Sequence, residues 1–159
     1  MATTILVPTD LRIASLNCVK MALESHLNAE QVHILLMHPM HLESSITGLL
    51  FYSQADILRS KVSPEFTEAL EIIKNRFSTQ ILGLRIKLFH GRTSSAFDRF
   101  LVANKIDQIF VPENYHLRLS SDTFDPLPLI LKCPCPHTKV VWPESIKQSE
   151  QEELTALFI

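Results

Sequence analysis

The fold of this chain is decided at residues 5–10, which read ILVPTD. Ile5, Leu6 and Val7 are apolar at consecutive positions, and such a run suits a strand that is buried on both faces, as the strands of a parallel sheet are. The strand ends at the proline that follows. Beyond it, apolar residues recur three or four positions apart, which predicts a helix with one buried face: Ile13, Leu16, Val19, Leu23 and Leu27.

Strand and helix patterns continue to alternate along the chain. The apolar runs predict five strands, near residues 4–8, 32–37, 84–89, 108–112 and 138–142. Between them, helices are expected within residues 40–62, from Ser63-Pro64, from Thr93 and, because of its prolines, briefly within residues 125–132. Strands joined by helices form right-handed parallel crossovers, so we expect an α/β fold with its ligand site at the carboxyl ends of the strands.

Composition narrows the class of protein. The chain has 159 residues, 46% of them hydrophobic and 20% charged, which suits one domain with a full core. A net charge of −2 excludes the strong field that would hold nucleic acid or an anionic membrane. No signal peptide or membrane-spanning run is recognisable, and Cys18, Cys133 and Cys135 do not make the disulfide framework of a secreted protein. We therefore expect a cytoplasmic protein that binds neither nucleic acid nor membrane.

Four segments follow one another in an order that resembles the universal stress protein family. They are ILVPTD at 5–10, HILLMHP at 33–39, FHGRTSSAFDRFLVANKIDQIFVPEN at 89–114 and CPCPHTKVVWP at 133–143. The first resembles the opening strand of that family, which ends close to Val-Pro-x-Asp. Gly91 and Asp107 stand where the family has a glycine after its third strand and an acid before its fourth. Cys135-Pro136 resembles its Cys-Pro before the last strand.

The resemblance covers about residues 4 to 143 and implies an open five-stranded parallel sheet of order 3-2-1-4-5, with helices on both faces. This Rossmann-like, universal stress protein-like α/β domain would occupy residues 1–143. The resemblance also implies a homodimer through the last strand, where the apolar edge is formed by Val140, Val141 and Trp142. Residues 144–159 form a tail that we predict to be helical, because Ser149 and Glu152 have the spacing of a capping box.

One part of the family pattern is missing. ATP-binding members resemble Gly-x2-Gly-x9-Gly-Ser/Thr after the fourth strand, where backbone N–H groups hold phosphates. Here Pro112 stands at the first glycine and Tyr115 at the second, and the third falls near residues 123–125, which contain no glycine. Members without these glycines are usually taken not to bind ATP. We therefore expect no cofactor, with ATP or AMP as the alternative.

The strand ends supply six candidate cleft residues for a ligand: Pro8, Thr9, Asp10, Pro39, Val111 and Pro112. Asp10 resembles the acid that contacts the adenosine part of a nucleotide in the family. The alternative is that Asp10 caps the following helix by accepting hydrogen bonds from its free N–H groups. The sequence leaves both roles open.

Two groups of residues could bind a metal. Cys133-Pro134-Cys135-Pro136-His137 contains soft ligands, but its spacing differs from the C-x2-C pairs of common zinc sites. His38, His41 and His90 follow strand ends, where they could form a cluster for a metal or a proton. In both cases we favour a structural role and predict no metal site.

The sequence indicates no catalytic residue, because it contains neither a nucleophile elbow nor paired carboxylates typical of hydrolysis. The leading hypothesis is a non-enzymatic, dimeric stress-response or signalling module that does not bind ATP through a glycine loop. The rival hypothesis is an adenine-nucleotide binder or weak ATPase with a rebuilt phosphate loop. In that case the phosphate contacts would come from His116, Arg118, Ser120 and Ser121.

Overall fold

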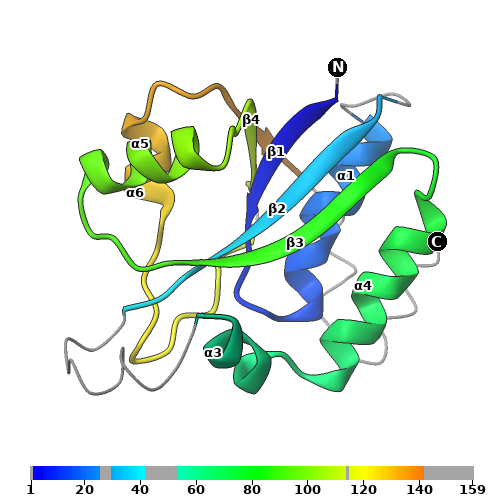
Figure 1. Ribbon diagram of the computed structural model, residues 1–159, viewed down its shortest axis with the longest axis horizontal. Helices are drawn as coiled ribbons and strands as arrows, with labels where there is room; N and C mark the ends of the chain where they lie inside the picture. Colours follow the sequence, from blue (N-terminus) through cyan, green and yellow to red (C-terminus); the bar gives the residue numbers. More distant parts are fainter. Residues whose placement is uncertain (1, 26–29, 42–53, 114, 142–159) are drawn as a thin grey trace.

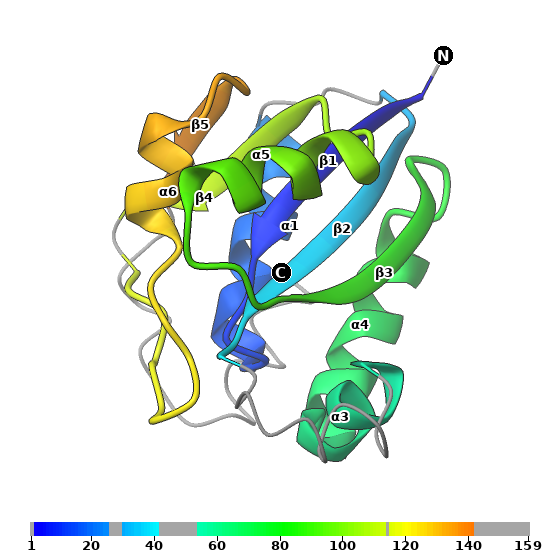
Figure 2. The same cartoon turned by 60° about the vertical axis from the view of Figure 1, so that its left-hand side comes forward.

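The structure is a computed structural model that describes residues 2–25, 30–41, 54–113 and 115–141. Its centre is a five-stranded sheet in the order β3-β2-β1-β4-β5, and every neighbouring pair is parallel (Figures 1 and 2). The strands are β1 (Thr3–Pro8), β2 (Val32–Pro39), β3 (Ile81–Phe89), β4 (Gln108–Pro112) and β5 (His137–Val140). This topology confirms the predicted fold class and strand order.

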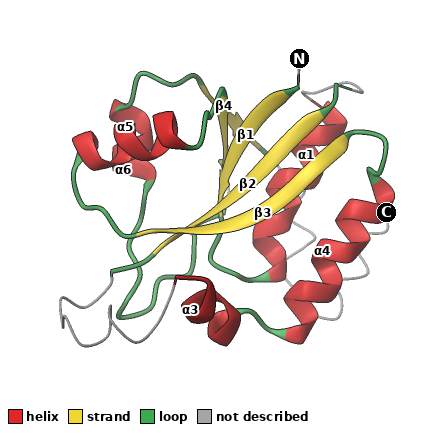
Figure 3. Ribbon diagram, viewed as in Figure 1, coloured by secondary structure: helices red, strands yellow, loops and turns green. Residues whose placement is uncertain are grey.

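Helices cover both faces of the sheet (Figure 3). On one face lie α1 (Leu16–Ser25) and α4 (Pro64–Arg76), and on the other lie α5 (Ser94–Ala103) and α6 (Leu127–Lys132). A single 3₁₀ turn, η1 (Ile13–Ser15), leads into α1, and α3 (Gln54–Lys61) precedes α4. Within the described ranges, no helix combines the length and the apolar character that crossing a bilayer requires.

Successive side chains of the buried strands enter two separate cores. Ile5 and Val7 of β1 pack in the core that contains α1 and α4, whereas Leu6 between them packs with α5 and α6. The alternation follows from the strand geometry, in which neighbouring side chains point to opposite faces. The six strand residues that we expected to be buried are at most 2% exposed: Ile5, Val7, Ile34, Leu36, Ile109 and Val111.

Local signals start two of the helices where the sequence predicts them. The Ser63 hydroxyl accepts a hydrogen bond from the Phe66 N–H at 3.1 Å, and α4 begins at Pro64. The Thr93 hydroxyl accepts one from the Ala96 N–H at 3.1 Å, and α5 begins directly after it. Each cap satisfies an N–H group that the helix itself leaves without a partner.

Gly91 makes the turn from β3 to α5 possible. A Cβ atom at this position would lie 2.7 Å from the Cβ of Ala96 and 2.9 Å from the ring of Phe89. These distances are shorter than real Cβ contacts, so any other residue would push the helix away from the strand. The glycine that the resemblance expects here therefore has a packing role.

The bounds of β5, α6 and α3 differ from the predicted ranges or cover only part of them. β5 ends at Val140, before the predicted limit near residue 142. The helix within residues 125–132 is short, as its prolines predict. Pro128 lies in the first turn of this helix, α6, where a missing N–H costs nothing. The helix expected within residues 40–62 is α3, while part of that range and the tail at 144–159 lie outside the described residues.

Candidate functional site

The candidate site lies beyond the carboxyl ends of β1 and β4. The strand order reverses at β1, and open α/β sheets bind ligands in the crevice at this point. Asp10 is the second residue after the end of β1. Between β4 and α6 lie residues 115–125, here called the crossing segment. One end of this segment contacts Asp10 and the other contacts the chain at the end of β2. The crossing segment therefore lies over the strand ends where a ligand is expected.

The Asp10 carboxylate holds one end of the crossing segment. Its Oδ2 accepts hydrogen bonds from the Tyr115 hydroxyl and, at 2.9 Å, from the backbone N–H of Arg118. Its Oδ1 accepts one from the N–H of Arg12 at 3.1 Å. Both carboxylate oxygens thus have donors from the chain itself.

Asp10 does not cap a helix, which corrects one of its two predicted roles. Arg12 is the N-cap of η1 and makes no side-chain cap bond. Because Asp10 precedes the N-cap by two residues, its carboxylate meets the N–H of Arg12 rather than those of the first helical turn. Leu11 between them has a φ of 62°, which turns the chain sharply at this point.

The other end of the crossing segment is attached to β2 and α3. The N–H of His41 donates to the carbonyl of Asp122 at 2.6 Å, and the His41 ring stacks on Phe124 with 4.7 Å between centroids. Lys61 of α3 forms an ion pair with the Asp122 carboxylate. The hydrogen bonds from Lys61 and Ser120 lower the pKa of Asp122, so this carboxylate remains charged. The crossing segment is therefore anchored at both ends.

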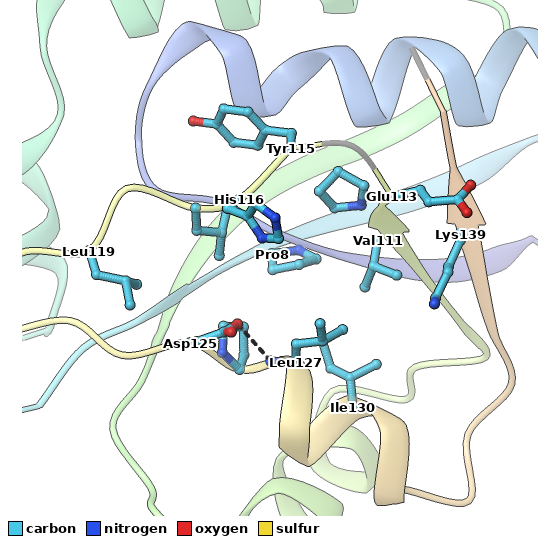
Figure 4. Close-up of a pocket in the computed structure, with 13 residues that line it drawn as sticks. Pro8, Val111, Glu113, Tyr115, His116, Leu119, Asp125, Leu127, Ile130 and Lys139 are labelled. Carbon is cyan, nitrogen blue, oxygen red and sulfur yellow. Dashed lines mark hydrogen bonds between the residues drawn. The ribbon is translucent and has the colours of Figure 1, made fainter.

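A pocket of about 180 Å³ remains between the crossing segment, the ends of β1 and β4, and α6 (Figure 4). Most of its lining is apolar and comes from Pro8, Val111, Leu119, Pro126, Leu127 and Ile130. The charged residues that line it are Glu113, Asp125 and Lys139, all exposed. Figure 4 shows the Tyr115 ring directed away from the centre of this pocket.

Solved structures share this architecture. The universal stress protein UspA from Lactobacillus plantarum matches at a TM-score of 0.55 and 15% identity, covering 87% of this chain and 97% of its own. A universal stress protein family protein from Burkholderia pseudomallei matches at 0.51 and 16%, covering 87% and 95%. The chain has the universal stress protein fold.

Four further solved structures resemble the chain, one of them without a family name and three at lower TM-scores. The hypothetical protein PH0823 matches at a TM-score of 0.53 and 16% identity, covering 91% of this chain and 99% of its own. At lower TM-scores of 0.43 to 0.49, three universal stress protein structures contain AMP, cAMP or dAMP. No protein-family model matches the chain, and neither does any curated protein. At these identities the matches establish the universal stress protein fold and do not identify a ligand for this chain.

The pocket contains half of the predicted cleft residues. Pro8, Val111 and Pro112 line it, as expected from their places at the ends of β1 and β4. Thr9 is fully buried, and its hydroxyl bonds Ser15 at 2.7 Å. Pro39 lies below the crossing segment, where its carbonyl accepts from the N–H of Phe124. Of the four predicted phosphate contacts in the crossing segment, His116 lines the pocket, whereas Arg118, Ser120 and Ser121 do not. The sequence pattern missed the wall supplied by α6, because no local signal indicates where this helix packs.

The cysteines lie away from the pocket of this universal stress protein fold. The Cys133 thiol donates a hydrogen bond to the carbonyl of Ile130 at 3.1 Å. Burial raises the pKa of the Cys135 thiol to about 11, and the nearby Cys133 and Asp107 add to this effect. Metal binding needs the thiolate form, which a raised pKa disfavours. Among the residues that the structure describes, no three His, Cys, Asp or Glu side chains are grouped as metal ligands.

His38 is buried at the end of β2 in its neutral form. It is 3% exposed, and its Nδ1 bonds the carbonyl of Thr9 at 3.0 Å. Its Nε2 is buried and has no hydrogen-bond partner within the described part of the chain. Burial lowers the pKa of His38 below its ordinary 6.5, and the nearby charge of Lys61 lowers it further. The carbonyl of Thr9 and the carboxylates of Asp122 and Asp10 raise this pKa but do not offset the effect of burial.

The stability of the domain is expected to fall as the pH drops below about 6.5. The unfolded chain binds a proton at His38 more readily than the folded chain does. The neutral ring therefore contributes fully to the free energy of unfolding above the pKa of the unfolded state, and this contribution is lost as the pH falls toward the lower pKa of the folded state. The loss is at most about 1.4 kcal/mol per pH unit. Urea unfolding between pH 7.5 and 5 measures it. His38→Gln should flatten the dependence, whereas His33→Gln, an exposed histidine on the same strand, should not. Equal slopes for the two variants would contradict this account.

Proposed function

We propose that this chain is a cytoplasmic, non-enzymatic stress-response or signalling module that does not bind ATP through a glycine loop. The observation that carries the proposal is the engagement of Asp10, whose carboxylate accepts hydrogen bonds from Tyr115 and Arg118 of the crossing segment. A nucleotide that used Asp10 would have to displace both of these partners. The universal stress protein fold supplies the context for the proposal.

Phosphate would also lack backbone N–H donors in this cleft. Pro112 and Pro126 have no N–H group, and the N–H of Leu127 already donates to the carboxylate of Asp125 at 3.0 Å. That carboxylate adds negative charge where an anion would approach α6. Two lost hydrogen bonds to charged phosphate oxygens correspond to about 3–6 kcal/mol. A micromolar affinity would thereby weaken about a hundredfold to ten-thousandfold.

Calorimetric titration with ATP and AMP, with and without Mg²⁺, tests the proposal. We expect dissociation constants of about a millimolar or weaker, and no ATP hydrolysis above background. Tyr115→Phe removes one of the two crossing-segment partners of Asp10 and keeps the ring. Because Pro112 and Pro126 still offer no N–H to phosphate, nucleotide binding should remain weak in this variant. A micromolar dissociation constant for ATP that Asp10→Ala abolishes would contradict the proposal and favour the rival nucleotide binder.

We further propose that the chain forms a homodimer through β5. This strand lies at one end of the sheet order, and unpaired edges favour pairing with a second chain. Val140 is buried in its own core and is not available for the contact, because its side chain points inward, whereas Val141 is 53% exposed. Trp142, the third residue of the expected edge, lies outside the described residues.

Light scattering at micromolar concentration should give twice the mass of the chain. Val141→Lys should shift the mass toward the monomer, because it adds a charge to the apolar contact. Val102→Lys changes an equally apolar residue that is 78% exposed on α5, away from β5, and should leave the mass unchanged. A monomeric mass for the unmodified chain would overturn the dimer.

A further inference from the structure

We propose that the pocket beneath the crossing segment binds a compact, neutral, apolar molecule of about the size of a substituted benzene. The proposal names the ligand class for the cleft discussed above, and it rests on the proposed function in which that cleft does not take a nucleotide. The pocket lies between the ends of β1 and β4 and the first turn of α6 (Figure 4).

The shape of the pocket suits such a molecule. Val111 of β4 and Ile130 of α6 point toward one another across it, and Pro8 closes its floor (Figure 4). Both aliphatic side chains are at most 2% exposed, so these walls belong to the rigid core of the domain. An apolar cavity of about 150 Å³ is large enough to bind benzene, and this pocket measures about 180 Å³. Sites for larger ligands usually have volumes of about 300 Å³ or more.

The buried part of the pocket offers few backbone hydrogen-bond donors to a polar ligand. Three of its lining residues, Pro8, Pro112 and Pro126, have no N–H group. The Leu127 N–H at the start of α6 donates to Asp125, and the Tyr115 hydroxyl donates to Asp10 outside the pocket. The polar side chains of the lining, Glu113, His116, Asp125 and Lys139, are all exposed. A polar ligand that moves past them to the buried apolar walls would lose its hydrogen bonds to water, whereas an apolar one loses none.

The charged residues of the lining disfavour anions. Glu113 and Asp125 contribute two carboxylates, against the single ammonium group of Lys139. All three are exposed, so they act at the entrance rather than among the buried apolar walls. An anionic ligand of the right size therefore meets net negative charge as it enters, and a neutral one does not.

Fluorine NMR with two probes of equal ring size tests the proposal on the full chain. Fluorobenzene should show saturable binding with a dissociation constant of about a millimolar or better. Fluorobenzoate carries a carboxylate on the same ring and should bind at least tenfold more weakly. No saturable binding of fluorobenzene, or fluorobenzoate binding as well as fluorobenzene, would overturn the proposal.

Two variants that narrow the pocket locate the binding. Leu119→Trp and Leu127→Trp each add volume to the lining and should weaken fluorobenzene binding at least tenfold. Leu131→Trp on α6 is the control, because Leu131 does not line the pocket. Its side chain is 50% exposed and that of Leu119 is 52% exposed, so the two substitutions are matched in exposure. Circular dichroism checks that each variant is folded, and either lining variant suffices if the other does not fold. Wild-type affinity in a folded lining variant would place the binding elsewhere and overturn the proposal.

An ATP titration of the fluorobenzene complex separates this inference from the proposed function. If fluorobenzene binds and millimolar ATP does not displace it, both stand. If neither molecule binds, only the apolar pocket is refuted. If micromolar ATP displaces fluorobenzene, the pocket is part of a nucleotide site and both are refuted.

Discussion

Replacing Asp10 with alanine is expected to lower the free energy of unfolding by about 3 kcal/mol. The substitution removes a carboxylate that accepts three hydrogen bonds, from Tyr115, Arg118 and Arg12. It also leaves the half-buried Tyr115 hydroxyl without this acceptor. Burial and the Asp10 carboxylate raise the pKa of Tyr115, so the hydroxyl is protonated and acts as a donor. Urea unfolding gives the free energy, and hydrogen exchange at the Arg118 amide should become faster.

Two further variants show whether the effect comes from the crossing segment. Asp10→Asn keeps an acceptor oxygen and loses the charge, so it should cost about half as much. Glu71→Ala removes an exposed carboxylate from α4, where its ion pair with Lys74 at 3.3 Å is a surface contact, and should cost less than about 1 kcal/mol. Unchanged exchange at the Arg118 amide in Asp10→Ala would show that Asp10 does not anchor the crossing segment.

Replacing Phe97 with alanine is expected to cost about 3–5 kcal/mol of stability. Phe97 of α5 is fully buried against the sheet, and its ring meets that of Phe89 edge-on at a centroid distance of 5.4 Å. Truncation removes the apolar contact and leaves a cavity in the core that α5 and α6 share with the sheet. Thermal or urea unfolding measures the loss.

Val102→Ala is the matched control for this core. Val102 lies on the same helix but is 78% exposed, so its truncation should change the stability by no more than about 0.5 kcal/mol. If Phe97→Ala costs as little as Val102→Ala, α5 is not packed against the sheet as described here.

Much of the fold could be predicted from the sequence because its signals are local. A run such as Ile5 to Val7 can bury side chains on both faces only inside a sheet that is covered on both sides. Ser63 and Thr93 meet N–H groups three residues away, so their cap bonds depend only on the neighbouring chain.

The candidate site was predicted only in part, because its contacts join distant parts of the chain. Nothing near Asp10 in the sequence distinguishes a helix cap from a ligand contact, so the sequence predicts either role. The structure adds a different partner: Tyr115, 105 positions away, donates its hydroxyl to this carboxylate. The buried position of Val140 and the entry of Ile130 into the pocket depend in the same way on how elements pack.

The sequence by itself therefore determined the strands and their burial, since each depends on residue types within a few positions. Only the tertiary structure decided that the crossing segment closes over Asp10 and leaves a small apolar pocket beside α6. The physical reason is that a hydrogen-bond partner or a cavity wall is set by the path of the chain in space, and segments far apart in the sequence reach one place only when the whole sheet has formed.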